Sequence, residues 1–523
     1  MSPILPNRPS SVRHRLFWGF GAQGGAILLR IVQQLALVPI LIHVWGTDLY
    51  GEWLVIFSAA SSLSIVDFGL QIYFGNALLI AWSKGDAAGF RRLFSNAAFL
   101  YAVILALALL ALATASAVVS WPELLATRLL SPEAAVATTF ILALVTLALV
   151  PFGLVTSLYR VHGDYSRGTV VSITAEALRG LGICAVVWFG GSPLAASFVS
   201  LLVAALFWAG VLLDLRRRYG PLPLGMTAPT PAELRTTVTR SAMYLASTVV
   251  TPVIVNAPVL LLGTLLAVPA AVVAYTTART FTGLVRQVVN QFCHLIGVEM
   301  TRQLAAGDRA RVIRIYAGAG RLIGGMAGLL GGFTLIAAPA FLRIWTRGQV
   351  PFDPWLIGAF VATVILTAPA YVGQMLYTYN NKPGILVAAQ GGYAAATVVF
   401  CLLLIRGYGA AGAAIGTGVA ELLTVGLLMP YAAAKEIASP LRGFFLRSYA
   451  AAGAAFLLGY GVGWALDAAL VAATLLGLVA LAVLWSAVVA MPAFFLVLDP
   501  QERHWLREAA VRYASRLRIA VGT

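Results

Sequence analysis

The chain has 523 residues, of which 60% are hydrophobic and only 10% are charged. Soluble globular domains carry about a quarter charged residues, so this composition excludes a soluble fold, and it excludes disorder for the same reason. Mean hydropathy is +0.90, and the apolar runs are long enough for membrane-spanning helices rather than barrel strands. The formal net charge of +16 is explained below by the placement of the basic residues.

Fourteen apolar segments are long enough to cross a bilayer, whose hydrocarbon core requires about 20 residues of helix. In chain order they are 17–44, 50–80, 96–119, 134–159, 169–190, 194–213, 241–264, 271–298, 314–342, 355–378, 384–405, 410–432, 448–466 and 471–497. The first exceeds the roughly 7–15 apolar residues of a cleaved signal peptide, so we expect it to stay as a spanning helix. The predicted fold class is an all-α polytopic membrane protein.

The basic residues of the loops predict the orientation. With the N-terminus placed in the cytoplasm, the cytoplasmic segments hold 26 Lys and Arg residues. The outside loops hold four, which are Arg128, Arg343, Arg347 and Arg406. Because Lys and Arg are enriched in cytoplasmic loops, both termini are predicted to lie in the cytoplasm. This bias also accounts for the net charge, so nucleic acid is not an expected partner.

The longest loop, 214–240, predicts the division of the chain. It holds three consecutive arginines and four prolines between the sixth and seventh segments. The expected parts are an N-terminal lobe 1–220, a cytoplasmic linker 221–240, a C-terminal lobe 241–434, two extra helices 435–498 and an amphipathic cytoplasmic tail 499–523. In the linker, Thr230, Pro231 and Glu233 match the start of a helix, and we expect a short surface helix there.

A weak internal repeat supports two related halves. Gly85-Asp86 follows the second segment and Gly307-Asp308 follows the eighth, and arginines come after both pairs. Paired halves that hold the substrate between them are typical of secondary transporters.

No residues match a catalytic or metal site. The cysteines, Cys184, Cys293 and Cys401, lie in different apolar segments, and the five histidines are isolated in sequence. Two stretches, 19–24 and 407–412, match a glycine-rich dinucleotide motif, but no strand precedes either of them. We therefore expect no enzyme activity, no cofactor and no metal.

Two further patterns predict packing or anchoring. Glycines recur at every fourth position in the ninth segment, at Gly320, Gly324, Gly328 and Gly332, which is typical of closely packed membrane helices. Tyr371, Gln374 and Tyr377 lie towards the end of the tenth segment. We expect the tyrosines to be interfacial anchors, and the alternative is that the three line a path for sugars.

Charges inside the predicted spans indicate where function lies, since each costs roughly 2.5–3.5 kcal/mol at the bilayer centre. They are Arg30, Asp67, Glu176, Arg179, Arg279, Arg286, Arg321 and Glu421. In the first segment Gln34 shares a face with Arg30. In the eighth, Arg279, Arg286 and Asn290 share a face, which we expect to line a cavity. The positive surplus predicts an anionic substrate, and arginine suits bidentate binding of phosphate.

Simpler interpretations stay open for several of these residues. Glu176 and Arg179, three positions apart, could neutralise each other. Arg321 lies less than two turns from the predicted cytoplasmic end of its helix and could extend to the interface. Asp67 could pair with Arg30 of the neighbouring helix.

Residues of the first helix pair resemble a known family. Val38-Pro39, Trp45-Gly46, Tyr50-Gly51-Glu52-Trp53 and the stretch 64–71 are similar to the first two helices of polysaccharide-unit flippases. These are the Wzx-type O-antigen and exopolysaccharide members of the multidrug/oligosaccharidyl-lipid/polysaccharide (MOP) exporter superfamily. The resemblance implies two six-helix lobes in a MATE-like V shape, a central cavity, and alternating access in the bacterial inner membrane.

The resemblance further implies an undecaprenyl-diphosphate-linked oligosaccharide, flipped from the cytoplasmic to the periplasmic leaflet for surface polysaccharide biosynthesis. Related lipid II flippases carry cavity arginines in helices 1, 2 and 8. Arg30 and Arg279 or Arg286 match helices 1 and 8, whereas helix 2 carries Asp67 instead.

The sequence therefore predicts a flippase with two groups of functional residues. The residues expected to bind diphosphate and sugar are Arg30, Gln34, Arg279, Arg286, Asn290 and Arg321. Those expected to couple transport to protons or sodium are Asp67, Glu176 and Glu421, because a carboxylate in low dielectric favours protonation. The expected partners are membrane lipids, the lipid-linked substrate and a polysaccharide polymerase. The alternative is a MATE-type cation-coupled multidrug exporter; a membrane glycosyltransferase is disfavoured by the short loops.

Overall fold

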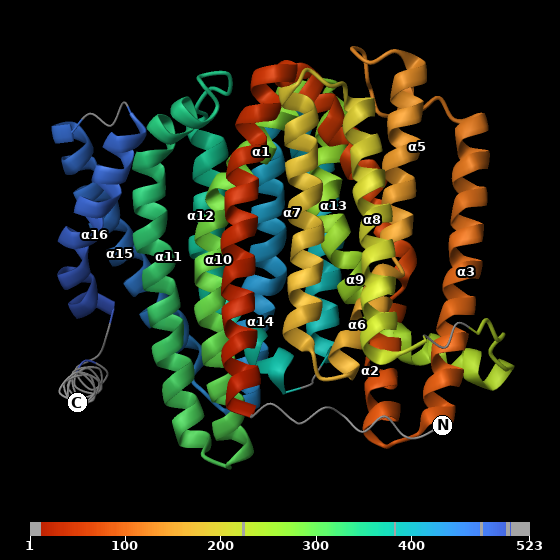
Figure 1. Cartoon of the computed structure of the whole chain (residues 1–523). Coiled ribbons are helices and arrows are strands. Elements are labelled where there is room, and N and C mark those ends of the chain that lie inside the picture. The colour runs from red at the N-terminus through yellow and green to blue at the C-terminus, as the bar shows by residue number, and fades with distance from the viewer. Residues whose placement is uncertain (1–11, 222–224, 381–382, 471–473, 498–502, 504–523) are drawn as a thin grey trace, which may run out of the picture. The chain divides into compact units, whose positions relative to one another are not determined.

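The structure is a computed structural model that describes residues 12–221, 225–380, 383–470, 474–497 and 503. All regular secondary structure in these residues is helical, and eleven stretches are long and apolar enough to cross a membrane (Figure 1). The prediction of an all-α polytopic membrane protein is therefore confirmed. The predicted amphipathic tail lies outside the described residues except for Arg503.

The chain forms two compact units, residues 1–276 and 277–523. The first contains α1 (Val12–Ser62), the 3₁₀ helix η1 (Leu63–Asp67), α2 (Leu70–Ser83), α3 (Ala87–Val118), α4 (Trp121–Leu124), α5 (Pro132–Leu149), α6 (Phe152–Val161), α7 (Tyr165–Trp188), α8 (Pro193–Tyr219) and α9 (Pro231–Leu266). Helix α10 (Pro269–Ala305) begins in the first unit and continues in the second. The second unit also contains α11 (Arg309–Trp345), α12 (Pro354–Tyr379), α13 (Pro383–Glu421), the π-helix η2 (Leu422–Gly426), α14 (Leu427–Ile437), α15 (Leu441–Leu470) and α16 (Leu475–Val497).

The fourteen predicted segments all lie on these helices. Helix α1 covers the first segment and part of the second, because Gly46, with φ of 74°, bends the chain between them. Gly409, with φ of 59°, bends α13 between the eleventh and twelfth segments. Glycine adopts such positive φ values at little cost. Dividing the two apolar stretches that contain these bends gives thirteen spans. The more polar α10 is the fourteenth.

The motif of the first helix pair anchors the first unit. The Glu52 carboxylate is buried and accepts backbone N–H groups of residues 128–130 at 2.6, 2.8 and 3.2 Å. Gly51 allows close approach to the start of α10, since a Cβ there would lie 2.4 Å from the carbonyl oxygen of Pro269. These two motif residues therefore hold loops and helices in place.

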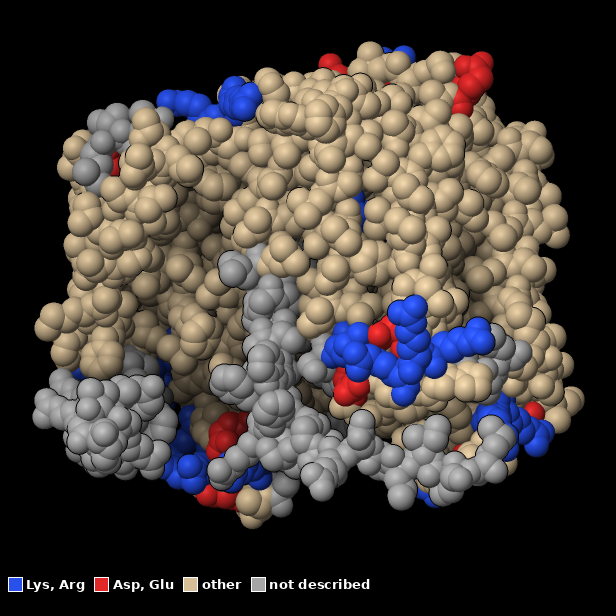
Figure 2. Space-filling view, viewed as in Figure 1, with Lys and Arg blue, Asp and Glu red and all other residues tan. Residues whose placement is uncertain are grey.

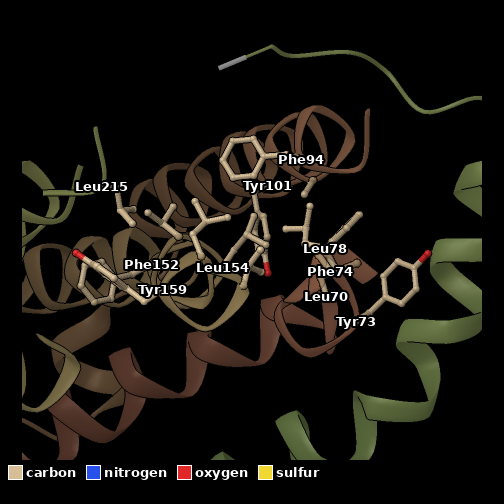
Figure 3. Packing of buried hydrophobic residues seen from close by; sticks show 14 of the residues in the cluster. Leu70, Tyr73, Phe74, Leu78, Phe94, Tyr101, Phe152, Leu154, Tyr159 and Leu215 are labelled. Carbon is tan, nitrogen blue, oxygen red and sulfur yellow. The ribbon is translucent and has the colours of Figure 1, made fainter. Parts of the chain in front are cut away.

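The core of the first unit is an apolar cluster between α2, α3, α6 and α8 (Figure 3). Its members include Leu70, Tyr73, Phe74, Leu78, Phe94, Tyr101, Phe152, Leu154, Tyr159 and Leu215. Figure 3 shows Tyr101 extending into this cluster beside Phe94. Close packing of the ring restricts its motion and so fixes the position of its hydroxyl group.

The repeated Gly-Asp pairs have the same local structure in both units. Gly85 and Gly307 have φ of 71° and 77°. Asp86 then caps α3 by accepting the N–H of Gly89 at 2.8 Å. Asp308 caps α11 in the same way, by accepting an N–H three residues later at 3.0 Å. Each pair thus ends one helix and starts the next.

The predicted helix start at residue 230 is confirmed. The Thr230 hydroxyl accepts the N–H of Glu233 at 3.3 Å, and the Glu233 carboxylate accepts the Thr230 N–H at 2.8 Å. The N–H group of Thr230 and its hydroxyl, which donates to the same carboxylate at 2.9 Å, hold the pKa of Glu233 below its usual value. The helix expected in the linker forms the first part of α9, which runs from Pro231 to Leu266 and so continues into the seventh segment.

The glycine repeat of α11 packs against α15, as predicted. A Cβ at Gly324 would lie 2.8 Å from the carbonyl oxygen of Ser448. At Gly328 it would lie 2.1 Å from the carbonyl oxygen of Ala452. The two backbones therefore approach more closely than any side chain would allow.

Gly328→Ala tests this packing. The added methyl group meets backbone, so we expect a loss of about 1–3 kcal/mol of stability and a lower thermal midpoint in detergent. Gly461→Ala is the matched control, since its Cβ on α15 would meet nothing within 4 Å. Equal midpoints for the two variants would contradict the close contact.

Candidate functional site

Four of the charged residues predicted within spans lie in two polar centres, one in each unit. The first is a cavity of about 390 Å³ in the first unit, formed by η1 and the helices α1, α2, α5, α7, α8 and α9. Its polar lining residues are Ser61, Ser64, Asp67, Gln71, Thr146, Arg179, Ser200 and Thr248. The cavity therefore combines one carboxylate and one guanidinium group with several hydroxyl groups.

Asp67 lies at a break in the second predicted segment. After η1, Phe68 and Gly69 adopt left-handed φ values of 47° and 77° before α2 begins. Gly69 is required here, because a Cβ would lie 2.7 Å from the carbonyl oxygen of Ser241 on α9. The segment expected as one helix is therefore divided, and discontinuous spans are typical of transporter binding sites.

The Asp67 carboxylate is buried and bonded within the unit. Its Oδ1 accepts the hydroxyl of Tyr101 at 2.7 Å and the backbone N–H of Gln71 at 3.3 Å. The second bond caps the first turn of α2, where free N–H groups favour a negative charge. Asp67 therefore stabilises the broken helix as well as lining the cavity.

The second centre is an ion pair between α10 and the end of α13 in the second unit. Arg286 donates from both terminal nitrogens to the two carboxylate oxygens of Glu421, at 2.8 and 2.9 Å. The Tyr371 hydroxyl donates to Oε1 of Glu421, and Tyr393 donates to Oε2 at 3.2 Å. The carboxylate therefore accepts four hydrogen bonds, two of them from a charged group.

The two partners differ in exposure. The side chain of Glu421 is 3% exposed, whereas that of Arg286 is 31% exposed. Arg279 and Asn290 lie on the same face of α10 and are half-buried. Arg286 is therefore neutralised on one side and accessible on the other, as a ligand-binding arginine requires.

Helix geometry changes directly after Glu421. The π-helix η2 occupies the next five residues, and Pro430 follows inside α14. Proline has no N–H for the carbonyl of residue 426 and its ring crowds that carbonyl, which favours a widened turn. Single π turns of this kind occur frequently at functional sites.

The structure combines residues for which the sequence predicted separate roles. Arg286 was expected to bind substrate and Glu421 to couple ions, yet they form one pair. Arg321 lies elsewhere in the second unit, where its Nε donates to the carbonyl oxygen of Val497 at 2.8 Å. Its roles as substrate ligand and interfacial arginine both stay predictions.

The remaining predicted residues lie on α1 and α7. Arg30 is on α1, but its side chain lies outside the described residues. Gln34, also on α1, is half-buried. Glu176 and Arg179 are on α7, and the backbone carbonyl of Glu176 accepts the side-chain amide of Gln33 at 3.2 Å. The roles predicted for these residues stay predictions.

The interpretation of Tyr371 as an interfacial anchor is wrong. It is buried and bonded to Glu421, because α12 packs against η2 and α13 in the same unit. Sequence reasoning missed Tyr393 and Tyr101 altogether. Tyr393 lies 28 residues before its partner and Tyr101 lies 34 residues after Asp67, so no local pattern connects either pair.

Comparisons with known proteins identify the fold. No family model and no curated protein matches the chain. Among solved structures it is similar to an inward-facing multidrug resistance MATE family transporter of the MOP superfamily, with a TM-score of 0.63 and 14% identity over 78% of this chain and 94% of that one. It is also similar to the lipid II flippase MurJ in an inward closed conformation, with a TM-score of 0.65 and 11% identity over 90% and 98%. The chain has a MATE/MurJ-like fold.

This result confirms the fold expected from the sequence resemblance. At 11–14% identity the likeness concerns the fold alone. The Wzx-type assignment and its substrate are therefore proposals.

A double-mutant cycle on Arg286 and Glu421 tests the second centre. Glu421→Ala leaves a partly buried guanidinium group and two tyrosine hydroxyls without their acceptor. We expect a cost of about 1–3 kcal/mol, between the values for exposed and buried pairs. The double variant should cost at least about 1 kcal/mol less than the sum of the single variants in unfolding measurements in detergent.

The matched control is the pair of Arg92 and Glu233, whose side chains are 60% and 30% exposed and whose atoms lie 2.6 Å apart. Its coupling energy should stay within about 0–1 kcal/mol, because solvent screens exposed ion pairs. Additive effects for Arg286 and Glu421 would contradict their pairing.

Proposed function

We propose that the protein is a flippase for an undecaprenyl-diphosphate-linked oligosaccharide. It moves this unit from the cytoplasmic to the periplasmic leaflet of the bacterial inner membrane by alternating access, for surface polysaccharide biosynthesis. The proposal is supported by the fold shared with a lipid II flippase over 90% of the chain. It is also supported by the arginines within the predicted spans and by the flippase-like first helix pair.

The observation that carries the proposal is that Arg286 is paired with a carboxylate and is still 31% exposed. The planar guanidinium group matches two oxygens of a carboxylate or phosphate equally well. In this structure it is engaged by Glu421, which is itself fixed by Tyr371 and Tyr393. A diphosphate arriving on the exposed side of Arg286 would accept the N–H groups that Glu421 does not use, and would compete with Glu421 for the positive charge.

Competition at Arg286 links substrate binding to protonation. A proton on Glu421 removes the charge that holds Arg286 and leaves the guanidinium group available to the diphosphate. The charged and titratable groups bonded to this carboxylate are Arg286, Tyr371 and Tyr393, from three helices. Asp67 and Glu176 are the further candidates for ion coupling.

A cation-coupled multidrug exporter is the second candidate. It is favoured by the likeness to a MATE transporter and by the buried carboxylate of Asp67 in the cavity of the first unit. Arg179 lines the same cavity and would repel a cationic drug. The flippase is therefore the preferred function, with a polysaccharide polymerase as its expected partner.

Charge changes at the pair test the proposal. Arg286→Glu should abolish surface polysaccharide in cells at normal protein levels, because two adjacent carboxylates repel a diphosphate. Glu421→Gln removes the competing charge, so purified protein should bind a polyprenyl diphosphate roughly tenfold or more tightly at neutral pH.

Arg92→Glu serves as the control for charge reversal at an exposed position. Normal polymer in the Arg286→Glu strain would refute the binding role of this arginine. Unchanged polymer together with increased drug susceptibility in the deletion strain would favour the exporter instead.

A further inference from the structure

A groove on the first unit lies between α7 and α8, apart from both polar centres. It encloses about 650 Å³. Its apolar walls are formed by Val171, Leu178, Leu181, Val203, Leu206 and Phe207. Leu181 and Leu206 are 56% and 60% exposed, so the groove is open to its surroundings. In a membrane-spanning chain, such surroundings are lipid.

Two glycines and one ion pair shape this groove. Gly182 permits close contact of the two helices, since a Cβ there would lie 2.7 Å from a methyl group of Val199. Gly210 borders the open part, where an added Cβ would meet nothing within 4 Å. At the other end, Arg167 binds Asp214 through two nitrogens at 2.7 and 2.9 Å. The helices are thus joined at both ends of the groove, which makes it a fixed feature.

The ion-paired end of the groove carries surplus positive charge. Asp214 also accepts Nε of Arg218 at 3.1 Å, and so holds two guanidinium groups side by side. Arg216 and Arg217 are exposed in the same last turn of α8. Asp164 and Asp214 are the carboxylates at this end, against four arginines. Figure 2 shows the basic patch where α8 ends, next to an uncharged surface.

The length of the groove matches one leaflet. Along α8 it runs from Asp214 to Val203, a rise of about 16 Å. This is roughly half of the 30 Å hydrocarbon core of a bilayer. An acyl chain that enters at Asp214, the arginine-rich end, therefore reaches the opposite end of the groove, near Val203.

We infer that the groove binds an anionic phospholipid. One acyl chain lies between α7 and α8 along Gly210, and the phosphate contacts the exposed guanidinium groups of Arg217 and Arg218. The apolar walls bind the chain by excluding it from water, and paired arginines match the phosphate oxygens. The positive-inside bias places this end in the cytoplasmic leaflet, which is where juxtamembrane basic residues attract anionic lipid. This lipid site is independent of the substrate that the protein transports.

Filling the groove is the first test. Gly210→Trp adds a ring at the open part of the groove, where its Cβ would meet no protein atom within 4 Å. We expect native mass spectrometry of the purified full chain with added phosphatidylglycerol to show at least tenfold weaker retention of one lipid. Gly453→Trp on α15 is the matched control, because that glycine is also exposed and its Cβ would meet nothing within 4 Å.

Neutralising the basic patch is the second test, and it leaves the Arg167–Asp214 pair intact. Arg217→Gln combined with Arg218→Gln should also reduce phosphatidylglycerol retention at least tenfold. The control pair, Arg343→Gln with Arg347→Gln, removes two exposed arginines of the other unit. Equal retention of phosphatidylcholine, or retention unchanged by both the groove and the patch variants, would overturn the site.

Discussion

The structure depends on the neutralisation of charges that lie within an apolar helix bundle. Arg286 and Glu421 are 135 positions apart in the sequence, and only tertiary packing of α10, α12 and α13 brings them together. Tyr371 and Tyr393 complete the shell of the carboxylate, so neither charge is left uncompensated. Because the side chain of Arg286 is 31% exposed, the same pair leaves its guanidinium group partly accessible.

In the first unit, a carboxylate within the helix bundle is stabilised by a break between two helices. Gly69 allows the chain to turn beside α9, and the turn presents the first N–H groups of α2 to Asp67. Tyr101, fixed in the apolar cluster, supplies a further donor. Among the described residues, a backbone N–H group and a tyrosine hydroxyl therefore donate to the carboxylate that lines this cavity. Both centres use backbone irregularity, a left-handed turn in one case and a π turn in the other.

Hydropathy alone predicts the fold class, since apolar runs of about 20 residues have few alternatives to membrane helices. Local chemistry also predicts the cap at Thr230 and the glycine face of α11, because each depends on neighbours close in sequence. The sequence did not predict the partner of Arg286, the break at Asp67 or the burial of Tyr371. These depend on contacts between distant helices, and a charge within a span indicates only that some partner exists.

The proposed transport is tested most directly by the leaflet distribution of polyprenyl-diphosphate-linked glycans in cells that lack the protein. The flippase predicts that the lipid-linked unit accumulates in the cytoplasmic leaflet, that surface polymer is lost, and that the wild-type chain restores both. A normal distribution between the leaflets, with normal surface polymer, would contradict it.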